Sequence, residues 1–139
     1  MKTKFFIPLA AVIFSAASVF AGEDVPAAVK TKFASEYSAA KKVKWEKEEG
    51  KFEAHFILNG TEMSATYDAI GNKLETETEI ETSALPKSVS EYVSKNYAGH
   101  KIKEAAKIVD ATGTVTYEAE LKSGDFIFDS NGNFLNKKE

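Results

Sequence analysis

The stretch Val25-Pro26-Ala27-Ala28-Val29 has a counterpart later in the chain, in Leu85-Pro86-Lys87-Ser88-Val89. After each opening an apolar residue recurs at every fourth position, and the two series end at Tyr37 and Tyr97. This spacing places the apolar side chains along one face of an α-helix. Proline suits the first helical position, because its missing N–H costs nothing there and its φ is already helical. The sequence therefore predicts two equivalent helices, one beginning at each proline.

The segments that follow the two predicted helices also correspond. Phe52-Glu53-Ala54-His55-Phe56 matches Tyr117-Glu118-Ala119-Glu120-Leu121, and the stretch from Tyr67 to Leu74 matches the stretch from Phe128 to Leu135. The displacement between the copies drifts slightly along the chain, so the loops differ in length while the elements remain. We interpret this pattern as a duplication, with one unit in residues 22–82 and a second in residues 83–139, which together form one compact domain.

Each unit is predicted to hold a helix followed by about four antiparallel strands. Alternation and turn residues place these strands at Val43–Lys47, Lys51–Leu58, Glu62–Asp68 and Lys73–Glu81, and then at Lys101–Asp110, Thr114–Lys122, Asp125–Asp129 and Asn133–Asn136. Asn59-Gly60 is typical of a two-residue hairpin turn, because both residues tolerate positive φ. The predicted fold class is α+β, a tandem repeat whose helices pack on one face of an antiparallel sheet. Whether the units form one sheet or two is left open.

The alternation along the strands separates a buried face from a polar one. The apolar parity of the first unit, expected to pack against the helix, comprises Val43, Trp45, Phe52, Ala54, Phe56, Leu58, Met63, Ala65 and Tyr67. The opposite face is expected to be polar and open to water, as antiparallel sheets allow. If the protein binds a partner, the predicted binding residues lie on that open face: Lys44, Glu46, Glu53, His55, Ile57, Thr66, Glu118 and Glu120.

These features together resemble the PepSY-like family of small exported proteins. The resemblance rests on Pro26, Pro86, Lys44-Trp45-Glu46, Phe52-Glu53-Ala54-His55-Phe56, Tyr67-Asp68 and Gly71. The family is described as β-lactamase-inhibitor-like and is frequent in Bacteroidetes-type bacteria. The second unit departs from the pattern, since Glu104 or a neighbour stands where Trp45 would be. The resemblance implies a tandem helix-and-sheet fold, an envelope or secreted location, no enzyme activity, and binding or inhibition of a secreted enzyme such as a peptidase.

The most unusual local feature is the alternating acidic segment Glu75-Thr76-Glu77-Thr78-Glu79-Ile80-Glu81. On a strand, alternate residues share a face, so the four carboxylates would stand in a row about 6.6 Å apart. One interpretation is a site for a cation or a lysine-rich partner. The favoured alternative is a solvated strand whose charges discourage edge-to-edge aggregation.

The sequence shows no catalytic constellation, and we predict neither a metal site nor a cofactor. The two histidines, His55 and His100, are far apart and occupy non-equivalent positions of the repeat. Nucleophilic catalysis needs a hydroxyl or thiol beside an oriented base, and no motif indicates one. The segment Asp129-Ser130-Asn131-Gly132-Asn133 has its glycine at the fourth position rather than the sixth of a calcium-binding EF-hand loop. We interpret it as a strand turn.

The N-terminal segment is typical of an export signal. Lys2 and Lys4 precede an apolar run from Phe5 to Phe20, and small residues near Ala21 suit cleavage after that position. The chain has no cysteine, which excludes disulfides, thiolate metal sites and a cysteine nucleophile. We expect a periplasmic or secreted protein that has no membrane attachment after cleavage.

The charge of the chain narrows the class of partner. All 18 basic residues are lysine, and without Lys2 and Lys4 the acidic residues, 21 in number, give a net charge of about −5. An acidic chain is a poor match for nucleic acid or anionic membranes, which attract basic patches. The first hypothesis is a non-catalytic binding module, an inhibitor or modulator of another exported protein, acting through the open face. The alternative is a carrier of a small molecule or cation that uses the strand from Glu75 to Glu81, and a hydrolytic enzyme is the weakest hypothesis.

Overall fold

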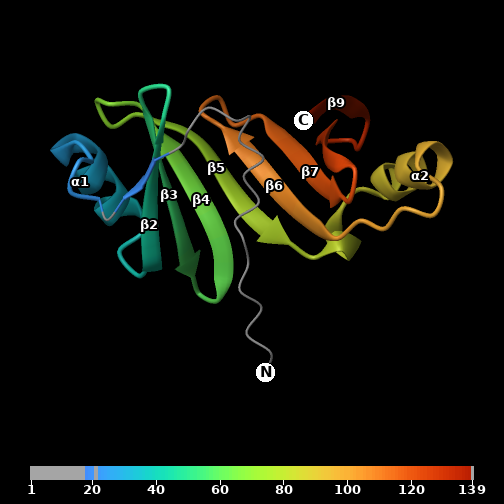
Figure 1. The fold of residues 1–139 in the computed structure, drawn as a ribbon, viewed down its shortest axis with the longest axis horizontal. Coiled ribbons are helices and arrows are strands. Elements are labelled where there is room, and N and C mark those ends of the chain that lie inside the picture. Colours follow the sequence, from blue (N-terminus) through green and yellow to red (C-terminus); the bar gives the residue numbers. More distant parts are fainter. Residues whose placement is uncertain (1–17, 21, 139) are drawn as a thin grey trace.

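The protein is an α+β structure with two helices and one antiparallel sheet, seen in a computed structural model that describes residues 18–20 and 22–138 (Figure 1). Most of the predicted export signal therefore lies outside the described residues. The elements in chain order are β1 (Ser18–Phe20), α1 (Ala27–Glu36), β2 (Lys41–Glu48), β3 (Lys51–Leu58), β4 (Thr61–Tyr67), β5 (Lys73–Ile80), the short 3₁₀ helix η1 (Thr82–Ala84), α2 (Lys87–Asn96), β6 (Glu104–Asp110), β7 (Val115–Leu121), β8 (Gly124–Asp129) and β9 (Phe134–Lys138). Each of the two α-helices precedes four strands, as the sequence predicted.

The nine strands form a single sheet in which every strand pairs with its neighbours in sequence. Strands β5 and β6 pair over Glu75–Ile80 and Ala105–Asp110, so the two groups of four strands are continuous across the middle of the sheet. The sequence left this point open, and the pairing shows one sheet. The helices lie at opposite ends of that sheet (Figure 1).

Both helices begin one residue later than predicted. Pro26 and Pro86 have ψ angles of 143° and 138°, so each is the extended residue that precedes the first helical turn. The prediction that proline fills the first helical position is therefore wrong by one residue, although proline still marks the start. Each helix ends where its apolar series ends, because the N–H groups of Tyr37 and Tyr97 close the last turn on Phe33 and Val93.

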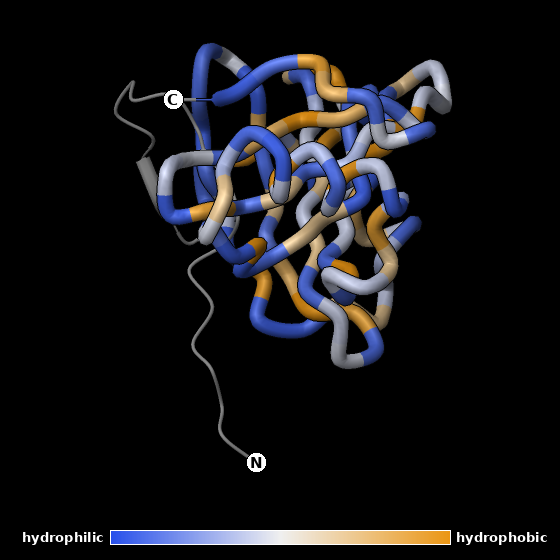
Figure 2. Tube along the Cα trace, turned by 90° about the vertical axis from the view of Figure 1, so that its right-hand side faces the viewer, coloured by the Kyte–Doolittle hydropathy of each residue, from blue (hydrophilic) through white to orange (hydrophobic). Residues whose placement is uncertain are grey.

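Two hydrophobic cores lie between the helices and the sheet. The core at α1 comprises Val25, Val29, Phe33, Trp45, Phe52, Ala54, Phe56, Ala65 and Tyr67. The core at α2 comprises Leu85, Val89, Val93, Ala105, Ala119, Leu121, Phe126 and Phe128. Hydrophobic stretches interleave with hydrophilic ones along the chain, as Figure 2 shows, which is the pattern expected of strands with one face against a helix. The apolar series that predicted the helices thus faces the sheet in both units.

The register shows that both cores use the same face of the sheet. Directly paired residues share a face, and the pairs Ala54–Ala65, Ala65–Thr76 and Thr76–Val109 lead from the first core to the second unit. Val109 in turn pairs with Val115 on β7, and Ala105 and Ala119, which share this face, belong to the second core. The opposite face of the sheet therefore carries neither helix.

Val43 was expected in the first core and is instead 38% exposed. The pairing of β2 with β3 shifts between Lys41 and Lys44, and Lys42 has a positive φ of 55°. A bulge of this kind adds a residue to one strand and turns the following side chains. Val43 therefore leaves the buried face, while Trp45 returns to it at 7% exposure.

The predicted turns are confirmed. Asn59 and Gly60 both have positive φ, 51° and 81°, as a two-residue hairpin requires. Asp129 accepts hydrogen bonds at Oδ1 from the backbone N–H groups of Asn131 and Asn133, which is the bonding of a strand turn. The turns that begin at Asp68 and Asp110 have the same pattern.

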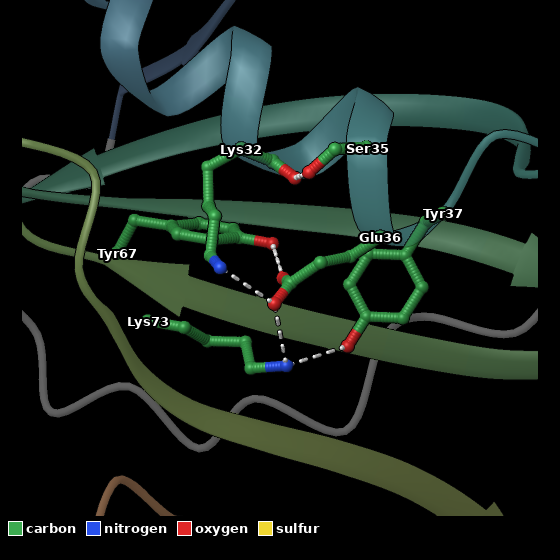
Figure 3. A network of polar contacts seen from close by, with 6 residues as sticks. All are labelled: Lys32, Ser35, Glu36, Tyr37, Tyr67 and Lys73. Carbon is green, nitrogen blue, oxygen red and sulfur yellow. Dashed lines mark hydrogen bonds and ion pairs between the residues drawn. The ribbon is translucent and has the colours of Figure 1, made fainter.

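A polar network joins α1 to the sheet at Glu36 (Figure 3). The hydroxyl of Tyr67 donates to Glu36 Oε2 at 3.2 Å, and Lys32 and Lys73 approach Oε1 at 3.2 and 3.4 Å. Burial by itself would raise the pKa of Glu36, but these contacts with the two lysines and Tyr67 hold that pKa below its ordinary value. The network fixes the end of α1 over β4 and β5.

The second unit replaces this network with aromatic contacts. Phe128 and Phe134 stand at the positions that Tyr67 and Lys73 hold in the first unit. Tyr92 of α2 stacks on Phe134 with ring centroids 4.7 Å apart and meets Phe128 edge-on at 5.5 Å. Both helices make aromatic contacts with the sheet, as Phe33 of α1 does with Trp45 and Phe56, and the first unit adds the polar network at Glu36.

Replacing Tyr67 with phenylalanine is expected to lower the free energy of unfolding by about 1 kcal/mol, because it removes one hydrogen bond to a carboxylate and leaves the ring in place. Denaturant titration measures the change. Tyr92→Phe is the matched control, because Tyr92 contributes ring contacts to the second core. Equal effects of the two substitutions would contradict a specific role for the Tyr67 hydroxyl.

Candidate functional site

The candidate site is the sheet face opposite the helices, which we call the helix-free face. Its residues of the polar parity at paired positions include Lys44, Glu46, Lys51, Glu53, His55, Ile57, Glu62, Ser64, Thr66, Glu75, Glu77, Glu79, Glu104, Ala106, Ile108, Glu118, Glu120, Asp125, Ile127 and Lys138. All eight predicted binding residues belong to it. Successive strand pairings bring Glu46, Glu53, Thr66 and Glu75 into one row across β2 to β5.

The acidic segment of β5 runs through the middle of this face. Glu75, Glu77 and Glu79 alternate along β5, whereas Glu81 lies beyond the strand, before η1. Because β5 is paired on both sides, by β4 and β6, its charges do not protect a sheet edge. The favoured interpretation of the segment was therefore wrong, and the row of four carboxylates is a row of three.

The helix-free face is strongly acidic. Its carboxylates include Glu46, Glu53, Glu62, Glu75, Glu77, Glu79, Glu104, Glu118, Glu120 and Asp125, while the lysines at paired positions include Lys44, Lys51 and Lys138. Crowded carboxylates repel one another, and partial burial strengthens that repulsion. The face therefore favours cationic groups.

The pKa values on this face are shifted in the direction that crowding predicts. Burial, with the neighbouring Glu118 carboxylate, raises the pKa of Glu77 to about 9. Burial, with the Glu120 carboxylate, raises the pKa of Glu104 to about 7. Burial also raises the pKa values of Glu62 and Glu75. At neutral pH this face carries fewer charges than its carboxylates would suggest.

Glu118 was expected on an open surface, but its exposed fraction is 0%. It pairs with Ala106 on one side and Ile127 on the other, both of them buried, and Lys138 Nζ donates to its Oε2 at 3.0 Å. Burial raises the pKa of Glu118, and Lys138 opposes that rise. The expectation of a uniformly open, polar face is therefore wrong at this point, because small and apolar neighbours leave water no access to the carboxylate.

His55 lies at the other end of the helix-free face, between two carboxylates. Its Nε2 is 3.5 Å from Glu46 Oε2 and 3.6 Å from Glu53 Oε2. The Nε2 atom is buried and has no hydrogen-bond partner among the described residues. Adjacent positions on β2 and β3 bring the three together, since Glu46 pairs directly with Glu53, and Lys44 pairs with His55.

Sequence reasoning missed Lys138, Glu104 and Asp125 as members of this face. Lys138 was missed because the last strand was expected to end at Asn136, whereas β9 continues to Lys138. The alternation of Asn136 and Lys138 along that strand was the available signal. Glu104 and Asp125 sit beside Glu120 in the register, so their strand parity could have placed them.

The fold and this face define a small α+β protein in which two helix-led groups of strands share one sheet. A family model described as "Putative beta-lactamase-inhibitor-like, PepSY-like" matches residues 15–72 and 51–136. These matches cover most of the chain, which therefore belongs to the PepSY-like family. No curated protein matches the chain.

Solved structures with the same fold come from Bacteroides species. A protein of Bacteroides eggerthii described as "putative periplasmic" superposes with a TM-score of 0.73 at 13% identity, covering 81% of this chain and 87% of that one. A DUF2874 family protein of Bacteroides uniformis gives 0.70 at 18% identity, with the same coverage of 81% and 87%. A BLIP-like protein of Bacteroides fragilis gives 0.65 at 23% identity, covering 81% and 85%. Within the described part of the chain, neither helix has the length and apolarity to cross a membrane.

Proposed function

We propose that this protein is an exported, non-catalytic binding module that modulates another exported protein, such as a secreted or periplasmic enzyme, through its helix-free face. The proposal is supported by membership of a family described as β-lactamase-inhibitor-like, and by fold similarity to a BLIP-like protein. The periplasmic description of another protein with this fold supports a location outside the cytoplasm.

The observation that carries the proposal is a sheet face rich in carboxylates on a hydrogen-bonded scaffold. Carboxylates recur from Glu46 on β2 to Asp125 on β8 without a break in the strand pairing. A sheet of this kind is already ordered, so a partner that binds it meets a low ordering cost. Charge of one sign steers an oppositely charged partner to the surface and fixes its orientation. The expected partner presents lysine and arginine side chains.

The rival function, a cation carrier on the acidic strand, has less support. At neutral pH the raised pKa of Glu77, about 9, keeps the central carboxyl of that strand protonated. A protonated carboxyl is a poor cation ligand, because metal ligands must be deprotonated. Burial alone would lower the pKa of Lys138, but the Glu118, Glu77 and Glu75 carboxyl groups raise it, so an ammonium group already lies beside this strand. The strand is therefore better suited to contact with a protein partner than to binding a free cation.

We propose that the two helix-led units are copies of one ancestral unit, and that the signal segment is removed after Ala21. Removal would take away Ser18–Phe20, which pair with Trp45–Lys47 as β1. The mature sheet would then consist of β2 to β9. None of the helix-free face residues would be lost.

Affinity capture with matched variants tests the binding proposal. The immobilised mature protein is exposed to envelope and culture-medium fractions of the source bacterium, beside a Glu62→Gln, Glu79→Gln, Glu120→Gln variant. Glu118 is left intact, because removing it would leave the partly buried Lys138 without its ion-pair partner. We expect the affinity for the captured protein to fall about tenfold or more in this variant, which corresponds to about 1.4 kcal/mol.

The control variant is Glu23→Gln, Glu49→Gln, Glu91→Gln, which changes the charge equally at exposed positions away from the helix-free face. It is expected to retain full binding. An equal loss of affinity in both variants would show that only the net charge of the protein matters, and would contradict a site on this face. Capture unaffected by either variant would contradict it as well.

A further inference from the structure

We propose that Glu46, Glu53 and His55 form a binding site for one divalent transition-metal ion, with zinc as the best match. Among the described residues this is the group of acidic and histidine side chains whose ligand atoms all lie within 4.8 Å of one another. Such a site belongs to the protein on its own, and it goes beyond the proposed partner binding.

The spacing of the three ligand atoms is the spacing of metal ligands. The Nε2 atom of His55 lies 3.5 and 3.6 Å from one oxygen of Glu46 and one of Glu53. Two ligands about 2.1 Å from a zinc ion and at the tetrahedral angle lie about 3.4 Å apart. A charged imidazolium donating directly to a carboxylate would instead approach to about 2.7–2.9 Å. The third separation, between the Glu46 and Glu53 oxygens, is within 4.8 Å.

The second observation is the state of the histidine. His55 Nε2 is buried and has no hydrogen-bond partner in the described structure, and its side chain is only 12% exposed. A buried polar atom without a partner destabilises the folded state, so native proteins almost always give it one. An ion held between Nε2 and the two carboxylates would satisfy this atom.

The ligand types select the metal. One imidazole and two carboxylates suit zinc, with a water or a partner's side chain in the fourth position. Calcium takes six to eight oxygen ligands and does not use imidazole. The site is also rigid, since Glu46 and Glu53 are directly paired on adjacent strands and His55 follows on the same face. Trp45 and Ala54, the pair next to them, are buried in the α1 core and anchor this part of the hairpin.

The surroundings favour a cation on balance. The helix-free face supplies further negative charge, while Lys44, the cross-strand partner of His55, opposes it. Lys44 is exposed, so its ammonium group is free to extend into water away from the three ligands. The charge of two carboxylates balances the charge of a divalent ion.

Calorimetric titration of the metal-free protein with zinc tests the site, with cobalt absorption as a second readout. We expect one zinc per chain and the intense visible bands of four-coordinate cobalt. His55→Ala and Glu53→Gln should weaken zinc binding by more than about 100-fold, because even the loss of an outer-shell partner costs about 10- to 100-fold. His100→Ala is the matched control, since His100 is an exposed residue in the turn after α2.

Thermal unfolding without metal shows whether a variant has lost its fold or only its metal site. Without zinc, the variants should have the melting temperature of the unmodified protein. Zinc affinity unchanged in His55→Ala would overturn the proposal. Equal loss in His100→Ala, or calcium binding as tight as zinc binding, would overturn it too.

Discussion

Replacing Gly132 with alanine is expected to lower the free energy of unfolding by about 3 kcal/mol. Gly132 has a φ of 82°, in the left-handed region, where a side chain costs about 1–2 kcal/mol. A Cβ there would also collide with Ser88 Oγ and come within 2.8 Å of Pro86 Cβ, at the start of α2. Overpacking of this kind costs about 1–3 kcal/mol more. The β8–β9 turn and the first turn of α2 would have to separate.

Gly113→Ala is the control, because the two glycines differ in their surroundings alone. Gly113 has a φ of 85° in a turn of the same pattern, but a Cβ there would meet nothing within 4 Å. Its replacement is expected to cost about 1 kcal/mol, the conformational part of the effect. Denaturant titration of both variants measures the difference. Equal losses would show that the contact with α2 contributes nothing.

The same close approach occurs in the first unit. A Cβ on Gly71 would lie 3.0 Å from the carbonyl oxygen of Ala28, in the first turn of α1. Ala28 and Ser88 stand at equivalent places in the two helices, each two residues after the proline. Ser88 adds a hydrogen bond of 2.7 Å to the carbonyl of Asn131. In both units, then, the last hairpin of the unit packs against the start of its own helix.

Local periodicity predicted most of the fold, because strands and helices impose strict repeats. The alternation in Lys51–Leu58 predicted the bounds of β3 without error, and the four-residue series predicted both helix faces. Val43 was misplaced because a bulge adds one residue without a distinctive sequence, so the alternation that holds from Lys44 onwards does not extend back to Val43. The joining of β5 to β6 could not be predicted, because it depends on pairing between units.

Strand parity predicted which residues share a face of the sheet, but not which of them come into contact. Parity placed His55 and Glu53 on one face, yet the approach of Glu46 depends on the hairpin register between β2 and β3. The burial of Glu118 depends on its neighbours on β6 and β8, and its ion pair on Lys138 of β9. Such contacts join residues distant in sequence, and no local pattern encodes them.

Replacing Glu77 with glutamine is expected to stabilise the protein at neutral pH by about 3 kcal/mol. Burial and the Glu118 carboxylate raise the pKa of Glu77 from 4.5 to about 9 in the folded chain. Below pH 4.5 the Glu77 carboxyl is protonated in both the folded and the unfolded state, so it does not lower the free energy of unfolding. As the pH rises from 4.5 towards 9, only the unfolded state ionises, and the native state loses about 1.4 kcal/mol per pH unit. Glutamine removes this loss, because its amide stays neutral.

Denaturant titration at pH 4, 7 and 9 measures the effect. The free energy of unfolding of the unmodified protein should fall as the pH rises through this range. The excess stability of Glu77→Gln over the unmodified protein should be largest at pH 9 and absent at pH 4. Glu91→Gln is the control, since Glu91 is an exposed partner of Lys87 on α2, where an ion pair contributes little. A pH dependence identical in Glu77→Gln and the unmodified protein would show that Glu77 is ionised in the fold. Glu77 would then add a negative charge to the helix-free face at neutral pH.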